Sequence, residues 1–310
     1  MQHQKTKFLN TFFLILVLTV GCSFGQQATD KDPLSKYAGA KSPVKLFPGE
    51  ISTSSLQWNN AFAQKNNLIF YCKRLLNREQ LVFQKYDGEH FSEPEPIPFD
   101  SIYNYSDPYV NPKGDHLIFM SNLPYQVNQD SITTNFQLWQ SHKHNNDWSK
   151  PKIVFPNPGG VGYPWRTKDG TLFFSMLPQD GSRSSNIYFA SYNNGKYAKP
   201  IALPDNINSK NRFEGDAFAS PNKEFLIFAA FDREGNMGFS DLYITFHKGD
   251  NVWSDPKSLG SKINSNGYDG SPYVTKDEKY LIFTSSRNSP GANSFFNHYI
   301  VKFNKEDYRD

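Results

Sequence analysis

Four acidic residues have the types and spacing that could do chemistry, because they fall near the start of a repeated segment. Asp107, Glu214, Asp216 and Asp269 each precede or begin an alternating apolar run. Carboxylates brought together could bind a cation, or could supply the two acids that flank a glycosidic bond during hydrolysis. Because these acids recur with the repeat, we expect instead that they accept hydrogen bonds from a neighbouring unit and fix its packing.

Other candidate side chains lie close to these acids. Tyr105, Tyr163 and Trp165 could stack on a sugar or a peptide, although most aromatic residues are expected to pack between units. His142 and His144 are two residues apart, a spacing compatible with a metal, but without a third ligand nearby we expect exposed loop histidines. No phosphate-binding loop, dinucleotide fingerprint or CxxC pair occurs, so the sequence predicts no catalytic residue, metal or cofactor.

The element that must position these residues is a unit that recurs five times. Tripeptides ending at Phe70, Phe119, Phe174, Phe228 and Phe283 are 49, 55, 54 and 55 residues apart, a period typical of stacked units or a ring of blades. Each unit has an alternating segment, a polar turn, a strand apolar on both faces, and a third strand rich in aromatic residues. Four short strands per unit, without an amphipathic helical run, predict propeller blades.

The predicted ring is closed by a segment from near the N-terminus. The fifth unit ends at Asp310 before its fourth strand, and residues 42–51 resemble the fourth-strand segments of the third and fourth units. We therefore predict that they complete the last blade and leave no sheet edge free. The fold class is all-β: a five-bladed β-propeller of four-stranded antiparallel blades over 42–310, with a six-bladed ring as the alternative. The predicted blades are 52–99, 100–157, 158–207, 208–264, and 265–310 with 42–51.

The first 21 residues are typical of a secretory signal peptide. Lys5 and Lys7 precede an apolar stretch from Phe8 to Val20 that is too short for a bilayer core needing about 20 residues. Gly21 and Cys22 resemble the lipobox of bacterial lipoproteins, which implies lipidation of Cys22, with simple secretion as the alternative. Residues 22–41 are predicted to be a flexible tether, and the protein is expected in the cell envelope, at the periplasmic or surface face of the outer membrane.

Charge and cysteine content limit the partners. The net charge is +3, and removal of the two signal lysines leaves +1, which argues against nucleic-acid binding. Cys72 is the only cysteine besides Cys22. It is therefore expected to be a small buried apolar residue in a fold without an intramolecular disulfide.

Two of the repeats resemble a known family. The segments GDAFASPNKEFLIFAAFDREG from Gly215 and DGSPYVTKDEKYLIFTSSR from Asp269 are similar to the WD-like, or PD-type, repeat of TolB-type propellers. The resemblance implies a monomeric, non-catalytic envelope lipoprotein whose scaffold binds a protein or a glycan. The alternative is a glycan-active enzyme, a glycoside hydrolase or lyase-like, that uses carboxylates at the channel mouth; it requires two or three of them in one open pocket.

Overall fold

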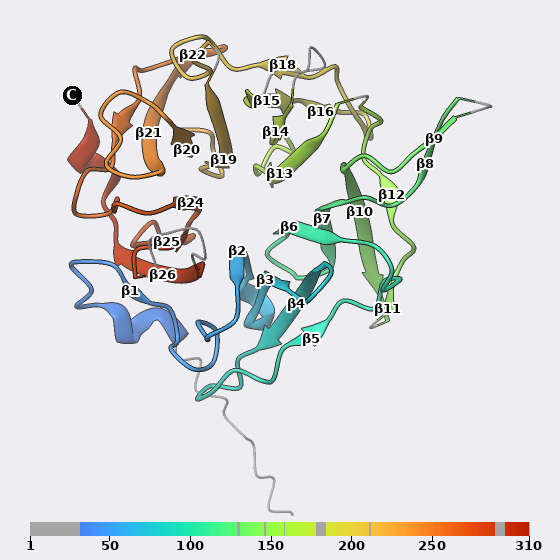
Figure 1. Ribbon diagram of the computed structural model, residues 1–310, viewed down its shortest axis with the longest axis horizontal. Coiled ribbons are helices and arrows are strands. Elements are labelled where there is room, and N and C mark those ends of the chain that lie inside the picture. The colour runs from blue at the N-terminus through green and yellow to red at the C-terminus, as the bar shows by residue number, and fades with distance from the viewer. Residues whose placement is uncertain are drawn as a thin grey trace, which may run out of the picture.

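The apolar Leu-x-Phe segment of every repeat forms the second strand of a four-stranded antiparallel sheet. The computed structural model describes residues 32–309 except 129–130, 146, 158, 178–183, 211 and 289–294. The predicted signal peptide and Cys22 therefore lie outside the described residues. Five such sheets stand around one axis (Figure 1), which confirms the predicted five-bladed propeller.

The strands of each blade follow one another from the axis outward. Blade 1 contains β2 (Gln57–Ala63), β3 (Leu68–Arg74), β4 (Glu79–Lys85) and β5 (Glu95–Pro96). Blade 2 contains β6 (Tyr105–Val110), β7 (His116–Ser121), β10 (Gln137–His144) and β12 (Lys152–Ile153). Blade 3 contains β13 (Val161–Arg166), β14 (Leu172–Met176), β15 (Asn186–Ala190) and β18 (Ile201–Ala202). Blade 4 contains β19 (Phe213–Ala219), β20 (Phe225–Phe231), β21 (Ser240–Gly249) and β23 (Lys257–Ser258). Blade 5 contains β24 (Asp269–Val274), β25 (Tyr280–Ser285), β26 (Asn297–Lys302) and, from the other end of the chain, β1 (Val44–Lys45).

Several short strands and 3-10 helices lie outside the four main strands of each blade. The turn-forming strands are β11 (Asp147–Trp148), which pairs with β10, β22 (Val252–Trp253), which pairs with β21, and the hairpin of β16 (Tyr192–Asn193) with β17 (Lys196–Tyr197). The hairpin of β8 (Tyr125–Asn128) with β9 (Ser131–Thr133) projects from blade 2 (Figure 1). The helices are single 3-10 turns: η1 (Pro33–Tyr37), η2 (Gln64–Asn66) and η3 (Lys305–Tyr308).

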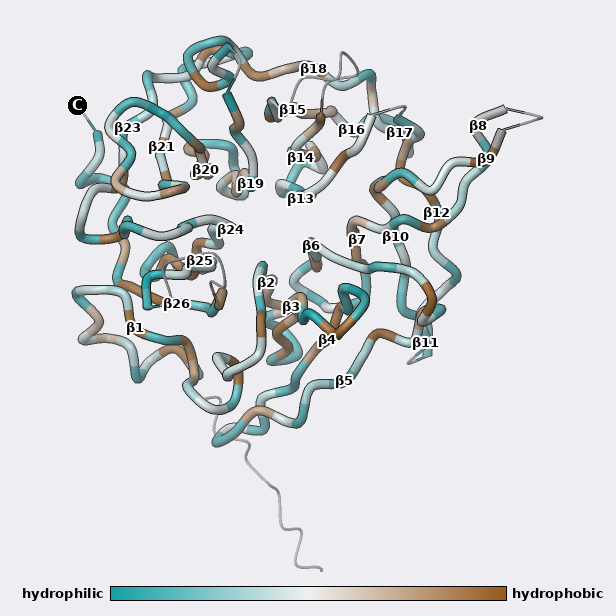
Figure 2. The backbone as a smooth tube through the Cα atoms, in the orientation of Figure 1, coloured by the Kyte–Doolittle hydropathy of each residue, from teal (hydrophilic) through white to brown (hydrophobic). Residues whose placement is uncertain are grey.

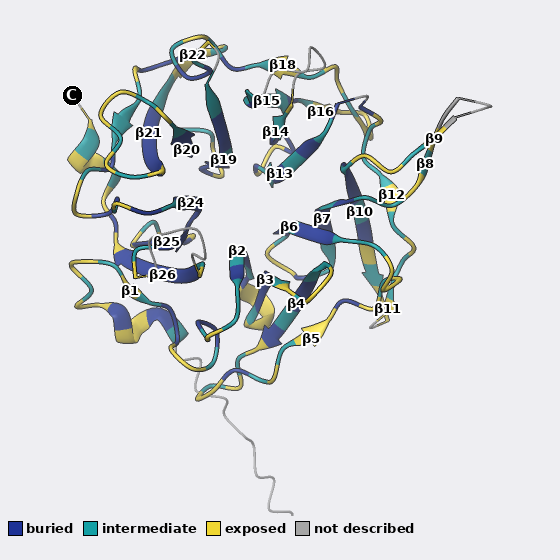
Figure 3. Ribbon diagram, viewed as in Figure 1, coloured by how far each residue is buried: buried dark blue, intermediate teal, exposed yellow. Residues whose placement is uncertain are grey.

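The core lies between blades. Phe70, Phe119, Phe174, Phe228 and Phe283 are at most 1% exposed, because each second strand is covered by a neighbouring blade on both faces. Figure 2 shows apolar stretches on strands inside the sheets, such as β3 and β7, and Figure 3 shows exposed residues at outer elements such as β5. Within the described residues no disulfide supports the ring, since Cys72 is a buried free thiol.

The ring is closed as the sequence predicted. Val44 pairs with Ile300 and Lys45 with Tyr299. The Leu46 N–H donates to the His298 carbonyl at 2.9 Å, and the Ser52 hydroxyl donates to the same oxygen at 2.9 Å. The N-terminal segment therefore joins first and last blades through backbone hydrogen bonds.

The segment just before this closing strand differs from the expected tether. Residues 22–31 lie outside the described residues, but residues 33–37 form η1, with Leu34 and Tyr37 buried. The Phe47 N–H donates to the Tyr37 hydroxyl, and the two rings meet edge to face at 5.5 Å. Leu34 and Tyr37 pack into the hydrophobic cluster that contains Phe47. The last residues of the predicted tether therefore lie against the ring.

The closure generates a stability prediction. Replacing the fully buried Leu46 by Ala should lower the free energy of unfolding by about 2–5 kcal/mol, because it leaves a cavity where the first and last blades meet. Val44→Ala is the matched control two residues away: its side chain is 40% exposed, so the loss should stay within about 0.5 kcal/mol. Urea denaturation measures both variants. Equal losses in the free energy of unfolding would contradict the prediction that Leu46 stabilises the junction of the first and last blades.

Candidate functional site

The centre of the ring is built from one bulged residue per blade. Asn59, Asp107, Tyr163, Asp216 and Ser271 have φ between 48° and 51°, in the left-handed region. Each lies where the pairing between the first and second strands shifts register. A bulge of this kind leaves its residue outside the ladder and re-aims the side chain. The five blades thus present one side chain each toward the channel.

Each bulged N–H leaves its own ladder and is taken up by the preceding blade. In three blades the acceptor is a side chain on the second strand: Asp107 donates to Cys72 Sγ at 3.1 Å, Asp216 to Ser175 Oγ at 3.2 Å, and Asn59 to Thr284 Oγ1 at 2.9 Å. These acceptors are equivalent, because each lies opposite the residue that precedes the bulge of its own blade.

The two channel aspartates replace this acceptor where it is missing. At the equivalent positions blades 2 and 4 carry Met120 and Ala229, which offer only a weak sulfur acceptor or none. There the carboxylates of Asp107 and Asp216 accept the next blade's N–H, from Tyr163 and Ser271 respectively, both at 3.1 Å. The structural role expected from the sequence is therefore present for these two acids.

The same two acids have unusual electrostatics. Asp107 accepts further hydrogen bonds from Asn59 Nδ2 at 3.1 Å and Ser106 Oγ at 3.2 Å. Asp216 accepts two more, from the Tyr268 hydroxyl at 2.7 Å and the Ser271 hydroxyl at 3.3 Å. Burial raises the pKa of Asp107. Burial, followed by the nearby charge of Asp107, raises the pKa of Asp216 to about 6. Both aspartates are half-buried residues, and their close hydrogen-bond partners leave little of each carboxylate free.

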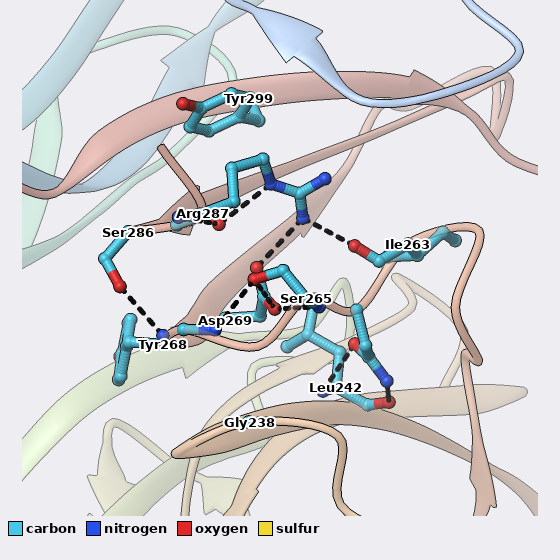
Figure 4. Close-up of polar contacts among 12 residues, drawn as sticks. Gly238, Leu242, Ile263, Ser265, Tyr268, Asp269, Ser286, Arg287 and Tyr299 are labelled. Carbon is cyan, nitrogen blue, oxygen red and sulfur yellow. Dashed lines mark hydrogen bonds and ion pairs between the residues drawn. The ribbon is translucent and has the colours of Figure 1, made fainter. Parts of the chain in front are cut away.

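The other two predicted acids lie in ion pairs within their own blades, Glu214 in blade 4 and Asp269 in blade 5. Glu214 and Asp269 are 0% exposed, and each faces an arginine that follows its second strand: Arg233 at 3.8 Å and Arg287 at 2.9 Å. Figure 4 shows the Arg287 guanidinium between Asp269 and the Ile263 carbonyl. Buried carboxylates paired in this way fix neighbouring loops. The structure therefore brings together Asp107 and Asp216, but not all four acids.

The aromatic candidates occupy three different places. Tyr105 packs against Phe99 and Phe119 inside the ring wall. Tyr163 is buried at the axis, where its hydroxyl donates to the Pro272 carbonyl at 2.9 Å. Trp165 lies farther along its strand, where the first strands end. These three residues thus do not form one surface.

The histidine and cysteine candidates do not build a metal or nucleophile site. His142 stacks on His116 with centroids 4.2 Å apart, and burial lowers the pKa of both rings. Among the described residues no group of three or more His, Cys, Asp or Glu is arranged to hold a metal ion. Burial raises the pKa of the Cys72 thiol well above its usual range, in keeping with the structural role expected for it.

Two further sets of residues surround the site, and the sequence did not predict either as a set, although Trp165 was already a candidate to stack on a ligand. Asn59, Ser271 and Tyr268 complete the hydrogen bonds of the channel aspartates. The second set is one aromatic residue per blade near the end of the first strand: Phe62, Tyr109, Trp165, Phe218 and Tyr273, here called the aromatic plate. A signal for the plate was present, since Tyr109, Phe218 and Tyr273 recur two residues after each bulge.

Comparisons with known proteins give the class of the fold. No family profile and no curated protein matches the sequence. Among solved structures, an α-L-arabinofuranosidase from Podospora anserina, crystallised with cellotriose, has a TM-score of 0.54 and 10% identity, over 86% of this chain and 98% of that one. A family-43 endo-arabinanase from Bacillus licheniformis has a TM-score of 0.53 and 10% identity, over 82% and 96%. TolB from Acinetobacter baumannii has a TM-score of 0.51 and 15% identity, over 81% and 55%.

These likenesses define the chain as a β-propeller of the kind shared by TolB and by glycoside hydrolases. They also correct the expectation of a non-catalytic scaffold. That expectation rested on the TolB resemblance, on the recurrence of the acids with the repeat and on the lack of a catalytic motif. Several of the solved structures that match along nearly their whole length are, however, glycan-cleaving enzymes. The alternative drawn from the sequence, a glycan-active protein, is the better supported one.

The raised pKa of Asp216 predicts a pH-dependent stability difference. The folded pKa of about 6 lies above the ordinary 3.8, so the folded state binds more protons between these values and the wild type loses stability as pH rises through them. Asp216→Asn does not titrate. Its free energy of unfolding relative to wild type should therefore increase by up to about 3 kcal/mol between pH 4 and pH 7. Urea denaturation at both pH values, with the exposed Asp205→Asn as matched control, measures this. A difference that stays constant would mean that Asp216 is not perturbed.

Proposed function

We propose that this protein is a glycan-active enzyme that hydrolyses glycosidic bonds with Asp107 and Asp216. The observation that carries the proposal is the pair itself: two half-buried aspartates from blades 2 and 4 lie close enough at the ring axis that the charge of Asp107 raises the pKa of Asp216. Glycosidases act with two carboxyl groups whose surroundings separate their pKa values. The similarity in fold to arabinofuranosidases and arabinanases supports the same conclusion.

The electrostatics assign the two roles. Asp216, with a pKa of about 6, keeps a proton to higher pH and is suited to protonate the oxygen of the leaving sugar. Asp107 supplies the second carboxylate, which takes a proton from the attacking water or attacks the sugar carbon itself. In either route the C–O bond of the glycoside breaks, the leaving oxygen gains the proton of Asp216, and water supplies the new hydroxyl.

The hydrogen bonds of the pair also prescribe the variants that test it. Because each carboxylate accepts a neighbouring blade's N–H, replacement by Ala would remove a structural contact together with the acid. Asn keeps one oxygen acceptor in nearly the same volume. Asp107→Asn and Asp216→Asn are therefore the substitutions that separate chemistry from folding.

The activity prediction uses a panel of arabinan, arabinoxylan, xylan and polygalacturonate, with release of reducing sugar as the measurement. The wild type should cleave at least one member, and Asp107→Asn and Asp216→Asn should each lower kcat by about 10²- to 10⁴-fold. Near-UV circular dichroism checks that each variant is folded.

Glu214→Gln is the matched control for Asp216, because it lies two residues away on β19 with its side chain toward Arg233. Its kcat should stay close to that of the wild type. A folded wild type that cleaves no member of the panel, or Asn variants that retain full kcat, would contradict the proposed chemistry.

We further propose that the enzyme is exported and held in the cell envelope by lipid on Cys22. The support is the basic and apolar segment that ends at Gly21, next to this cysteine. In the part of the chain that the structure describes, no helix is long and apolar enough to cross a membrane. The anchor would keep the propeller close to envelope glycans.

The anchoring prediction concerns the membrane fraction. Cys22→Ala removes the thiol that carries the lipid, so the protein should move from the membrane pellet to the soluble envelope fraction, or accumulate unprocessed. Fractionation followed by immunoblotting measures this, with Cys72→Ala as a control that retains the membrane location. Membrane retention of correctly processed Cys22→Ala would exclude lipid anchoring.

A further inference from the structure

The second mouth of the channel holds a cavity that the proposed reaction does not use. It has a volume of about 550 Å³ and opens where the first strands end, beyond the aromatic plate; we call it the cup. Asp107 and Asp216 lie two residues nearer the start of the same strands than Tyr109 and Phe218. The plate therefore stands between the acid pair and the cup, and the cup is a separate site.

The floor of the cup is a rigid aromatic surface. Trp165 lies at its centre, 4.7 Å from the Phe218 ring, 5.5 Å from Tyr109 and 5.6 Å from Tyr273, and Phe62 packs on Tyr273 at 5.3 Å. The indole N–H donates to the Ala219 carbonyl at 2.8 Å, which fixes the ring. Phe62 and Trp165 keep part of their surface exposed. Exposed faces of fixed aromatic rings are suited to stack on the C–H face of a sugar.

The rim of the cup carries a strong positive charge. The lining residues include five cations, Lys65, Lys113, Arg166, Lys168 and Lys276, against one acid, Asp115. This excess of four charges exceeds the net charge of +3 of the entire sequence. A concave site lined by one sign of charge concentrates counter-ions from solution.

Nearby acids do not neutralise these lysines. Asp169 pairs with Lys223 at 2.6 Å, Asp277 with Lys279 at 2.9 Å, and Glu224 with Lys305 at 2.7 Å. In the described part of the chain, none of the four rim lysines has an ion-pair partner. The rim thus presents free cations around an apolar floor.

The cup also continues into a second cavity. A space of about 450 Å³ between blades 5 and 1 shares Phe62, Gln64, Tyr273 and Lys276 with it. Each cavity has the size of an ordinary small-molecule site.

From these features we infer that the cup binds an acidic oligosaccharide, with its sugar rings on Phe62 and Trp165 and its uronate carboxylates among the rim lysines. Neutral sugars would leave the cations without partners, and a duplex nucleic acid is too wide for a pit at the ring axis. The inference deepens the proposed function, on which it rests for the class of ligand, by naming uronate-containing glycans and giving them a binding site apart from the acid pair.

The experiment compares two ligands that differ only in charge. The full chain in detergent is titrated calorimetrically with trigalacturonate and with the neutral galactose trisaccharide of the same linkage. Trigalacturonate should bind at least tenfold more tightly, and the advantage should shrink as salt is raised. Lys168→Gln/Lys276→Gln should weaken its binding at least tenfold, whereas Lys152→Gln, on the exposed outer strand β12, should leave it unchanged.

A second variant keeps the test informative about the floor. Phe62→Leu removes the aromatic face but retains apolar volume, so it should weaken both trisaccharides to a similar extent. Equal affinity for the two trisaccharides, no effect of the lysine substitutions, or tighter binding of a single-stranded oligonucleotide would each overturn the inference.

The test also separates this inference from the proposed function. If the wild type and Asp216→Asn bind trigalacturonate equally well but the wild type cleaves no glycan of the panel, the inference about the cup is supported and the proposed hydrolase activity is wrong. If the wild type cleaves a glycan but does not bind trigalacturonate, the hydrolase stands and the inference about the cup is wrong.

Discussion

The ring depends on one backbone N–H per blade. A left-handed bulge near the start of each first strand takes this group out of the ladder, and a buried donor without an acceptor costs about 1–3 kcal/mol. Each blade therefore relies on the preceding blade for an acceptor, and the first blade relies on the fifth, since the Asn59 N–H donates to Thr284 Oγ1. The blades are therefore expected to unfold cooperatively, because no blade provides the acceptor for its own bulged N–H.

This constraint explains why acids lie in the channel at all. Two of the five second strands carry Met120 and Ala229 where an acceptor is required, and in those same blades the bulged residue is an aspartate. In these two blades the acceptor is an aspartate on the first strand instead of a side chain on the second strand, and it therefore lies at the ring axis. Burial there, and for Asp216 also the charge of Asp107, raises the pKa of the carboxyl group. The structural substitution and the proposed catalytic pair thus share one geometry.

The sequence predicted the ring but only half of the acid arrangement. The period of the Leu-x-Phe strands and the likeness of residues 42–51 to later fourth strands were enough to predict five blades and their closure, because both are carried by hydrophobic pattern. Glu214 and Asp216 differ by two residues and would share a face in a regular strand. The bulge at Asp216 separates their side chains. The sequence does not reveal this bulge, because the residue with positive φ is an aspartate and not a glycine. In blade 1 the bulge at Asn59 lies four residues before the strand end, against three in the other blades, which also hides the place of Phe62 in the plate.

The η1 contacts have a mechanical consequence. If the chain is attached to a surface through its first residues, any tension enters the propeller at its seam, where β1 contributes only two residues to the sheet. Tyr37 lies before β1 and Phe47 after it, and their ring contact, together with the hydrogen bond from the Phe47 N–H to the Tyr37 hydroxyl, links the two ends of this strand. A force on the N-terminus would have to separate Tyr37 from Phe47 before it could detach β1 from β26. These contacts therefore protect the closing strand against a force applied through the anchor.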